Sequence, residues 1–250
     1  MSSAAPAVEF LPRPAVGRVF TSEVSVRLAD VDCNGNMRLD ATARTLQDIA
    51  TDDASDAGLD RRFGWLVRRT MIATNQPARL GETVTVATWC SGIGRSWAER
   101  RSELIGDRGA AIDAVSLWVQ VAVETGRPAR IGSDFTDAYA GAASGRTVSA
   151  RLALPSPPER PAHRSWTVRR TDLDPFGHVN NAATWAFLEE AAAIDRTERI
   201  GRAEMEYLQP VEHDADLALV ADVDGDGDAV TAWLLGDGVR AAARWTPDRA

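Results

Sequence analysis

Apolar and polar residues alternate along two long parts of this chain. In the first part the alternation runs through VTVATW, WAERRSELI and AVSLWVQVAV, and in the second through AEMEYLQPV, DLALVADV, AVTAWLLG and VRAAARW. A period of two is typical of strands with one buried face. The pattern therefore predicts two meanders of antiparallel strands.

A stretch with helical spacing precedes each meander. The apolar residues recur at three-to-four spacing, which predicts a helix of about 15 residues with one buried face. They are Leu39, Ala43, Leu46 and Ile49 in the first stretch, and Ala183, Phe187, Leu188 and Ala191 in the second. We expect a short strand before each helix, over residues 23–28 and 166–170. One helix followed by a meander implies a sheet wrapped around that helix, which is an α+β fold.

The two parts are copies of one another. Residues 26–50 align without gaps with residues 168–192, and nine of the 25 positions are identical. Gln76-Pro77 matches Gln209-Pro210 at an offset of 133, and Trp118 matches Trp245 at an offset of 127. Three matches in the same order indicate an internal duplication with a more compact second copy.

The duplication predicts the domain organisation. We expect a flexible segment over residues 1–19, a first unit over 20–140 and a second unit over 163–250. Prolines break regular structure between them, so residues 141–162 are predicted to be a linker, part of which could dock as an edge segment.

The charged residues exclude several kinds of chemistry. The chain has 28 basic and 36 acidic residues, a net charge of −8, and every basic residue is arginine. Without lysine there is no Schiff base and no phosphate-loop lysine. An acidic chain without a basic stripe argues against nucleic acid as a partner. Two cysteines and three histidines, without metal-ligand spacing, predict no metal site and no cofactor.

The chain shows neither a secretory signal nor a membrane span. Its first residues, MSSAAPAVEFLPRPAVGR, lack a basic start followed by an apolar core, and no run approaches 18 apolar residues. We therefore expect a cytoplasmic protein.

The strongest candidate chemistry lies in the turn that opens the second copy, DLDPFGHVNN. Gly177 permits a tight turn, and Asn180 or Asn181 can cap the following helix, whose first amides then stabilise developing negative charge. Asp174 and His178 could converge on one carbonyl as base and hydrogen-bond donor. In the alternative interpretation, Asp174 only forms an Asx turn and the asparagines only cap the helix.

The first copy helps to separate these interpretations. It keeps the two aspartates and the glycine but reads CNGNMRL where the second copy reads PFGHVNN. The shared residues are therefore requirements of the turn, whereas His178, Asn180 and Asn181 are what only the second copy adds. One active site per duplicated chain is the simplest interpretation.

The motif HVNN after D-x-x-G resembles hot-dog-fold thioesterases, and the doubled arrangement resembles the acyl-acyl-carrier-protein thioesterase family of double hot-dog enzymes. In plant members the motif reads D-x-N-x-H-V-N-N. Asp174 and His178 match it, whereas Phe176 stands in place of the catalytic asparagine. Glu190 matches the family's helix glutamate.

Other family positions differ in this chain. Thr184 replaces the tyrosine of the helix, and Pro210 and Val211 replace a Glu-Cys pair. The D-P-F-G-H run looks more like single hot-dog acyl-CoA thioesterases, in which the aspartate is the central acid-base group or nucleophile. The resemblance thus leaves open whether Asp174 is nucleophile or base.

The resemblance implies a thioesterase that releases a fatty acid from acyl carrier protein or coenzyme A, with the acyl pocket in the non-catalytic first unit and the catalytic residues in the second. Asp174 would attack the thioester or activate water, with the oxyanion near the amides of Gly177 and His178 and with Glu190 as a supporting residue. A hot-dog hydratase or dehydratase and a non-catalytic acyl-binding module are the alternatives, and a homodimer stays open. Three arginine pairs could dock an acidic carrier or could equally be solvated surface residues: Arg68-Arg69, Arg100-Arg101 and Arg169-Arg170.

Overall fold

The computed structural model describes residues 10–59, 63–159, 163–193, 200–223 and 229–247. The described residues form one ten-stranded sheet in the order β1-β3-β4-β5-β2-β7-β10-β9-β8-β6, and all its pairings are antiparallel. The first half comprises β1 (Phe20–Ser25), α1 (Leu39–Asp56), β2 (Phe63–Gln76), β3 (Thr83–Ile93), β4 (Trp97–Gly106), β5 (Ala111–Ala122) and α2 (Ser133–Ala143). The second comprises β6 (His163–Trp166), α3 (Trp185–Ala193), β7 (Ile200–Tyr207), β8 (Leu217–Val223), β9 (Val230–Leu235) and β10 (Val239–Pro247).

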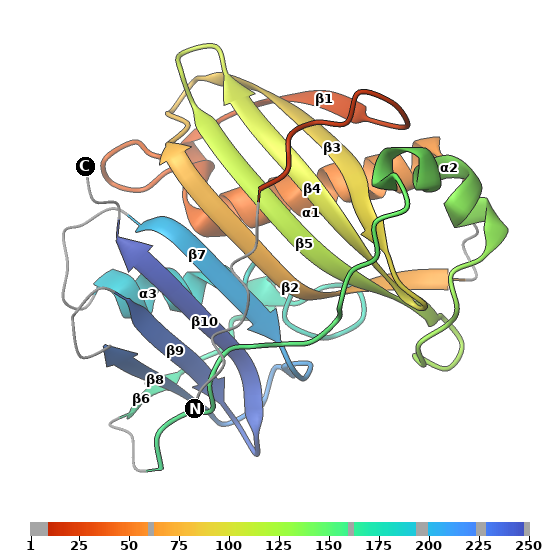
Figure 1. Ribbon diagram of the computed structural model, residues 1–250. Coiled ribbons are helices and arrows are strands. Elements are labelled where there is room, and N and C mark those ends of the chain that lie inside the picture. Colours follow the sequence, from red (N-terminus) through yellow and green to blue (C-terminus); the bar gives the residue numbers. More distant parts are fainter. Residues whose placement is uncertain (1–9, 60–62, 160–162, 194–199, 224–228, 248–250) are drawn as a thin grey trace, which may run out of the picture.

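The two halves join through β2 and β7 in the middle of the sheet (Figure 1). Arg69 pairs with Glu206, and Ala73 pairs with Arg202. Under the sequence offset of 133 these two pairs exchange with each other, because 69 corresponds to 202 and 73 to 206. The copies are therefore related by an approximate two-fold axis through this pairing.

The helices α1 and α3 lie behind the sheet in Figure 1 and contact each other. Leu39, Leu46 and Ile49 are buried on α1, as their spacing predicts. The helix stops at Gly58, whose φ of +67° is a left-handed conformation that glycine adopts readily.

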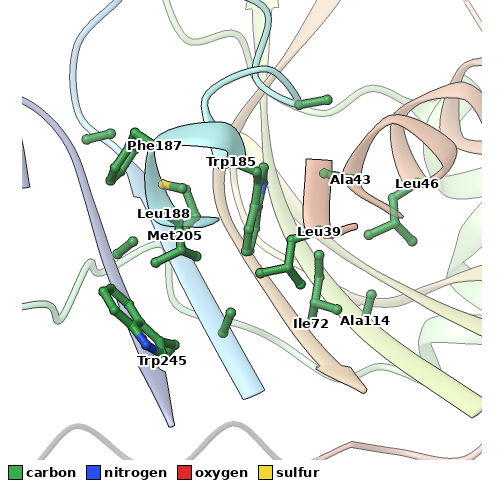
Figure 2. Packing of buried hydrophobic residues seen from close by; sticks show 14 of the residues in the cluster. Leu39, Ala43, Leu46, Ile72, Ala114, Trp185, Phe187, Leu188, Met205 and Trp245 are labelled. Carbon is green, nitrogen blue, oxygen red and sulfur yellow. The ribbon is translucent and has the colours of Figure 1, made fainter. Parts of the chain in front are cut away.

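Bulky residues fill the core of the second half. Trp185, Phe187 and Leu188 of α3 are almost fully buried, and Ala43 of α1 stands where α3 has Trp185. Figure 2 shows these residues in one cluster with Leu39 and Met205. The cluster thus runs continuously from α1 of the first half to α3 of the second.

Both short strands begin earlier than the alternation predicts. Strand β1 ends at Ser25 and β6 ends at Trp166 because a 3₁₀ turn follows each, over Leu28–Asp30 and Arg170–Asp172. In each turn the last aspartate accepts the N–H of the residue before the turn, at 2.8 Å from Arg27 and 2.9 Å from Arg169. The first aspartate of each D-x-D motif therefore ends the strand rather than extending it.

The segment predicted as a linker begins inside the last turn of α2, a helix that the sequence analysis missed. Its irregular part crosses in front of the sheet, away from α1 and α3 (Figure 1). The Glu206 carboxylate on β7 accepts the N–H groups of Ala153 at 2.6 Å and Leu154 at 3.2 Å. The linker thus docks on a face of the sheet, at its middle, and not at the edge that we expected.

Residues 1–9 of the N-terminal segment expected to be flexible, and linker residues 160–162, lie outside the described part of the chain. None of the described helices is long and apolar enough to cross a membrane.

Candidate active site

The second-copy turn is held together by the Asp174 carboxylate. Its Oδ1 accepts the N–H groups of Phe176 at 2.9 Å and His178 at 3.3 Å, while the backbone of Asp174 accepts from Gly177 and donates to His178. Gly177 has a φ of +81°, which explains why glycine stands there. Oδ2 has no hydrogen-bond partner among the described residues, so it remains available for chemistry.

The first-copy turn has the same hydrogen bonds. Asp32 Oδ1 accepts the N–H groups of Asn34 at 2.8 Å and Asn36 at 2.9 Å, and Gly35 has a φ of +79°. An Asx turn is therefore a shared structural role of both aspartates, as the alternative interpretation proposed for Asp174. The geometry of the turn cannot by itself distinguish the two copies.

The surroundings of the turns do differ. A cavity of about 650 Å³ lies between α1, strands of the first half and the second turn. Its apolar walls include Leu59, Phe63, Trp65, Trp118 and Phe135. The second copy contributes Asp174, Pro175, Phe176, Asn180 and Asn181. Asp32 and its neighbours in the first turn do not line this cavity.

The turn that leads into α3 supplies a free amide beside the cavity. Asn180 Oδ1 accepts the N–H of Ala182 at 2.8 Å and caps the turn over residues 181–184 that runs into α3. The N–H groups of Asn181 and Ala183 have no acceptor among the described residues, and Asn181 lines the cavity. The Tyr207 hydroxyl fixes this segment, because it donates to the Asn181 carbonyl at 3.1 Å and accepts from Trp185 Nε1 at 2.8 Å. A helix start of this kind attracts negative charge.

The remaining sequence-predicted residues lie elsewhere. The N–H groups of Gly177 and His178, near which we expected the oxyanion, already donate to Asp174 within the turn. The His178 side chain does not line the cavity. Glu190 is exposed, 3.9 Å from Arg164, beside a smaller hollow. The structure therefore brings Asp174, Asn180 and Asn181 to one cavity but not His178 or Glu190.

A buried polar cluster at the end of α1 was missed by the sequence analysis. Asp53 binds Arg18 and Arg100, each at 2.6 Å, and accepts from the Tyr139 hydroxyl at 2.9 Å. Burial raises the pKa of Tyr139 to about 12. Arg100 also lines the cavity, which makes this cluster part of its wall. The sequence feature that could have revealed this cluster is Asp53, an acidic residue at a position on the buried face of α1.

A second missed residue is Gln47, which lines the cavity from α1. Its side-chain amide makes no hydrogen bond to any described residue. The sequence signal was the repeat itself, since the offset of 142 aligns Gln47 with Glu189.

One of the arginine pairs expected on a docking surface is buried. Arg101 is 2% exposed and binds Glu99 at 3.1 Å, while Arg100 points to Asp53. Their carboxylate partners hold both guanidinium groups inside the first half. The Arg100-Arg101 pair is therefore unsuited to docking an acidic carrier from solution, and this expectation was wrong.

An antiparallel sheet wrapped around a helix, built twice and joined edge to edge, defines the class of double hot-dog proteins. Two solved structures share this fold. An acyl-ACP thioesterase from Bacteroides thetaiotaomicron has a TM-score of 0.78 at 21% identity, covering 92% of this chain and 98% of that one. The 12:0-ACP thioesterase from Umbellularia californica has a TM-score of 0.71 at 21% identity, with the same coverage. The fold predicted from the sequence is confirmed.

The sequence comparisons identify the family. Residues 17–139 match the acyl-ACP thioesterase N-terminal domain, and residues 156–235 match its C-terminal domain. The chain belongs to the acyl-ACP thioesterase family, a family of thioester hydrolases. An uncharacterized protein of Mycobacterium tuberculosis is 30% identical over 92% of this chain and 93% of its own length. The chloroplastic oleoyl-acyl carrier protein thioesterase of Coriandrum sativum is 24% identical over 91% of this chain and 69% of its own length.

Proposed function

We propose that this protein hydrolyses fatty acyl thioesters of acyl carrier protein to a free fatty acid and a thiol, with Asp174 at the reacting carbonyl. The observation that carries the proposal is that three features lie at one place: the cavity with its aromatic walls, a free carboxylate oxygen of Asp174, and the unpaired N–H of Asn181. The second-copy turn combines all three.

The acyl chain would lie in the first-half cavity. Its volume of about 650 Å³ falls inside the range of about 300–1,000 Å³ that is typical of small-ligand sites, and aromatic residues line it. The thioester would stand at the second turn, where the cavity meets Asp174. The first copy then holds the substrate, and the second performs the reaction.

Two free groups would act on the carbonyl. Asp174 Oδ2 either attacks the carbonyl carbon directly or removes a proton from an attacking water. The carbonyl oxygen becomes negative and is stabilised by the Asn181 N–H at the helix start. The carbon–sulfur bond then breaks, and the thiolate leaves and is protonated. Direct attack would leave an anhydride at Asp174 that water must open, whereas the general-base route forms the acid in one step.

His178 and Glu190 have subordinate roles in this proposal. The His178 backbone completes the Asp174 turn, and its imidazole, which does not line the cavity, takes no part in the step at the carbonyl. Glu190 is too far along α3 to touch the carbonyl, since the helix rises about 1.5 Å per residue. We also propose the carrier protein rather than coenzyme A as the natural thiol, because the similar thioesterases of Coriandrum sativum, Bacteroides thetaiotaomicron and Umbellularia californica are named for it.

The test measures hydrolysis of acyl thioesters of acyl carrier protein and of coenzyme A over a series of acyl chain lengths. A thiol reagent detects the thiol that each reaction releases. We expect release of one thiol per fatty acid, with a higher kcat/KM for the carrier-protein thioester. Binding without thiol release would favour an acyl-binding module. Loss or gain of a double bond without thiol release would favour a hydratase, and either result would overturn the proposal.

A further inference from the structure

The first helix is capped by the second copy. The carboxylate of Glu189 on α3 accepts the N–H of Leu39 at 2.8 Å and that of Asp40 at 3.4 Å. The residue that precedes α1, Arg38, makes no side-chain cap to the helix amides. Burial raises the pKa of Glu189 to about 7. A carboxylate from one copy therefore fills the helix start of the other.

The approximate two-fold axis predicts which residues lie at the equivalent site in the second copy, before α3. At the offset of 142, Glu189 corresponds to Gln47, Leu39 to Asn181, and Asp40 to Ala182. Gln47 and Asn181 do line one cavity, as this relation requires. Gln47 thus stands at the second helix start where Glu189 stands at the first.

The two sites differ in what occupies the amides. In the first, Glu189 takes the N–H groups of Leu39 and Asp40. In the second, Asn180 caps Ala182, and both the Asn181 N–H and the Gln47 side-chain amide have no partner among the described residues. A glutamate at position 47 would place a second negative charge beside Asp174 and compete for the free amide. A carboxamide instead adds a neutral donor to the site.

We infer that Gln47 is a catalytic residue supplied by the first copy, whose side-chain N–H binds the thioester carbonyl oxygen together with the Asn181 N–H. The inference rests on the proposed function, because the carbonyl is the group that both donors meet. The active site is then composite: the first copy gives the cavity and one donor, and the second gives the carboxylate and the helix start. The mirrored site is closed by Glu189.

The test compares isosteric variants at the mirrored positions. Gln47→Met keeps the size of the side chain and removes its donor, and should lower kcat and kcat/KM together by about 10²-fold, as loss of an oxyanion donor does. Gln47→Glu should lower kcat further, because its carboxylate opposes negative charge on the substrate oxygen. Glu189→Gln, the matched control, should retain kcat within about twofold because it touches no substrate.

Three results would overturn the inference, each in a distinguishable way. The first result is a folded Gln47→Met variant with normal kcat while Asp174→Asn is inactive. It refutes the role of Gln47 and leaves the proposed function intact. An increase in KM alone, with kcat unchanged, shows ordinary substrate binding and no stabilisation of the oxyanion. Absence of thiol release by the unmodified protein removes the proposed function and the inference with it. Thermal melts of all variants establish that each is folded, and Gln47→Glu replaces Gln47→Met as the deciding variant if the latter is not.

Discussion

The two copies share a turn and differ in what lies opposite it. Asp32 and Asp174 make the same pair of hydrogen bonds, and Gly35 and Gly177 have nearly the same φ. Opposite the first helix start lies the Glu189 carboxylate, whereas a cavity lies opposite the second. The comparison teaches that the aspartate and glycine of the motif serve the fold, and that contacts between the copies decide which turn faces the cavity.

The packing of the two halves follows the same division. The second half has large buried side chains such as Trp185 and a hollow of about 300 Å³ along α3, while the first half has a cavity of about 650 Å³ along α1 and adds α2 beside it. The two copies therefore differ in the size of the space beside their helix. In the proposed function, the substrate pocket and the reacting carboxylate belong to different copies.

The largest expected effect is on kcat, and it differs between substitutions of Asp174 and of Asp32. Asp174→Asn keeps a carbonyl oxygen for the turn but removes the carboxylate, and should lower kcat by about 10²–10⁴. Asp32→Asn should keep near-normal turnover, because its turn does not reach the cavity. Steady-state hydrolysis of one long-chain acyl thioester measures both. The opposite pattern, with Asp32→Asn inactive and Asp174→Asn active, would move the active site to the first copy.

The next largest effect is on the free energy of unfolding and concerns the core of the second half. Trp185→Ala removes a fully buried indole and its hydrogen bond to Tyr207, and should lower the free energy of unfolding by about 3–5 kcal/mol. The corresponding change in the first copy, Ala43→Gly, should cost only about 1 kcal/mol through helix propensity. Urea unfolding of both variants gives the comparison. Equal losses would show that the two halves are packed alike.

The smallest effect is the pH dependence of the inter-copy cap. Burial raises the pKa of Glu189 from 4.5 to about 7, so its stabilising contribution is complete below about pH 4.5 and is lost as the pH rises through about 7. Glu189→Gln stays neutral and still accepts from Leu39. Its stability relative to the unmodified protein should therefore rise over this pH window, by at most about 3 kcal/mol. Thermal melts across the window measure this, and a constant difference would contradict the assignment.

Much of the fold could be predicted because its signals are local. Alternation gives the long strands, helical spacing gives α1 and α3, and the repeated D-x-D-x-x-G gives both turns. The strand ends were misplaced because Asp30 and Asp172 form 3₁₀ turns that alternation does not reveal. The motif also led to Asp174, Asn180 and Asn181, which do line the cavity.

The rest of the site depends on contacts between distant segments. Gln47 and Asn181 line one cavity only because the copies pair through β2 and β7, and no local pattern shows which helix faces which turn. Arg100 is buried because Asp53, on α1, lies beside β4. The repeat offset was the one sequence signal that could relate Gln47 to Glu189 before the structure was known.

The central claim is that one composite site forms across the two copies, at the second turn. A crystal structure with a non-hydrolysable acyl thioester analogue tests it most directly. We predict the acyl chain in the cavity along α1, with the carbonyl oxygen within hydrogen-bond distance of the Asn181 N–H and the carbonyl carbon facing Asp174. An analogue bound at the first turn, with its carbonyl at the Leu39 N–H in place of the Glu189 carboxylate, would contradict the claim.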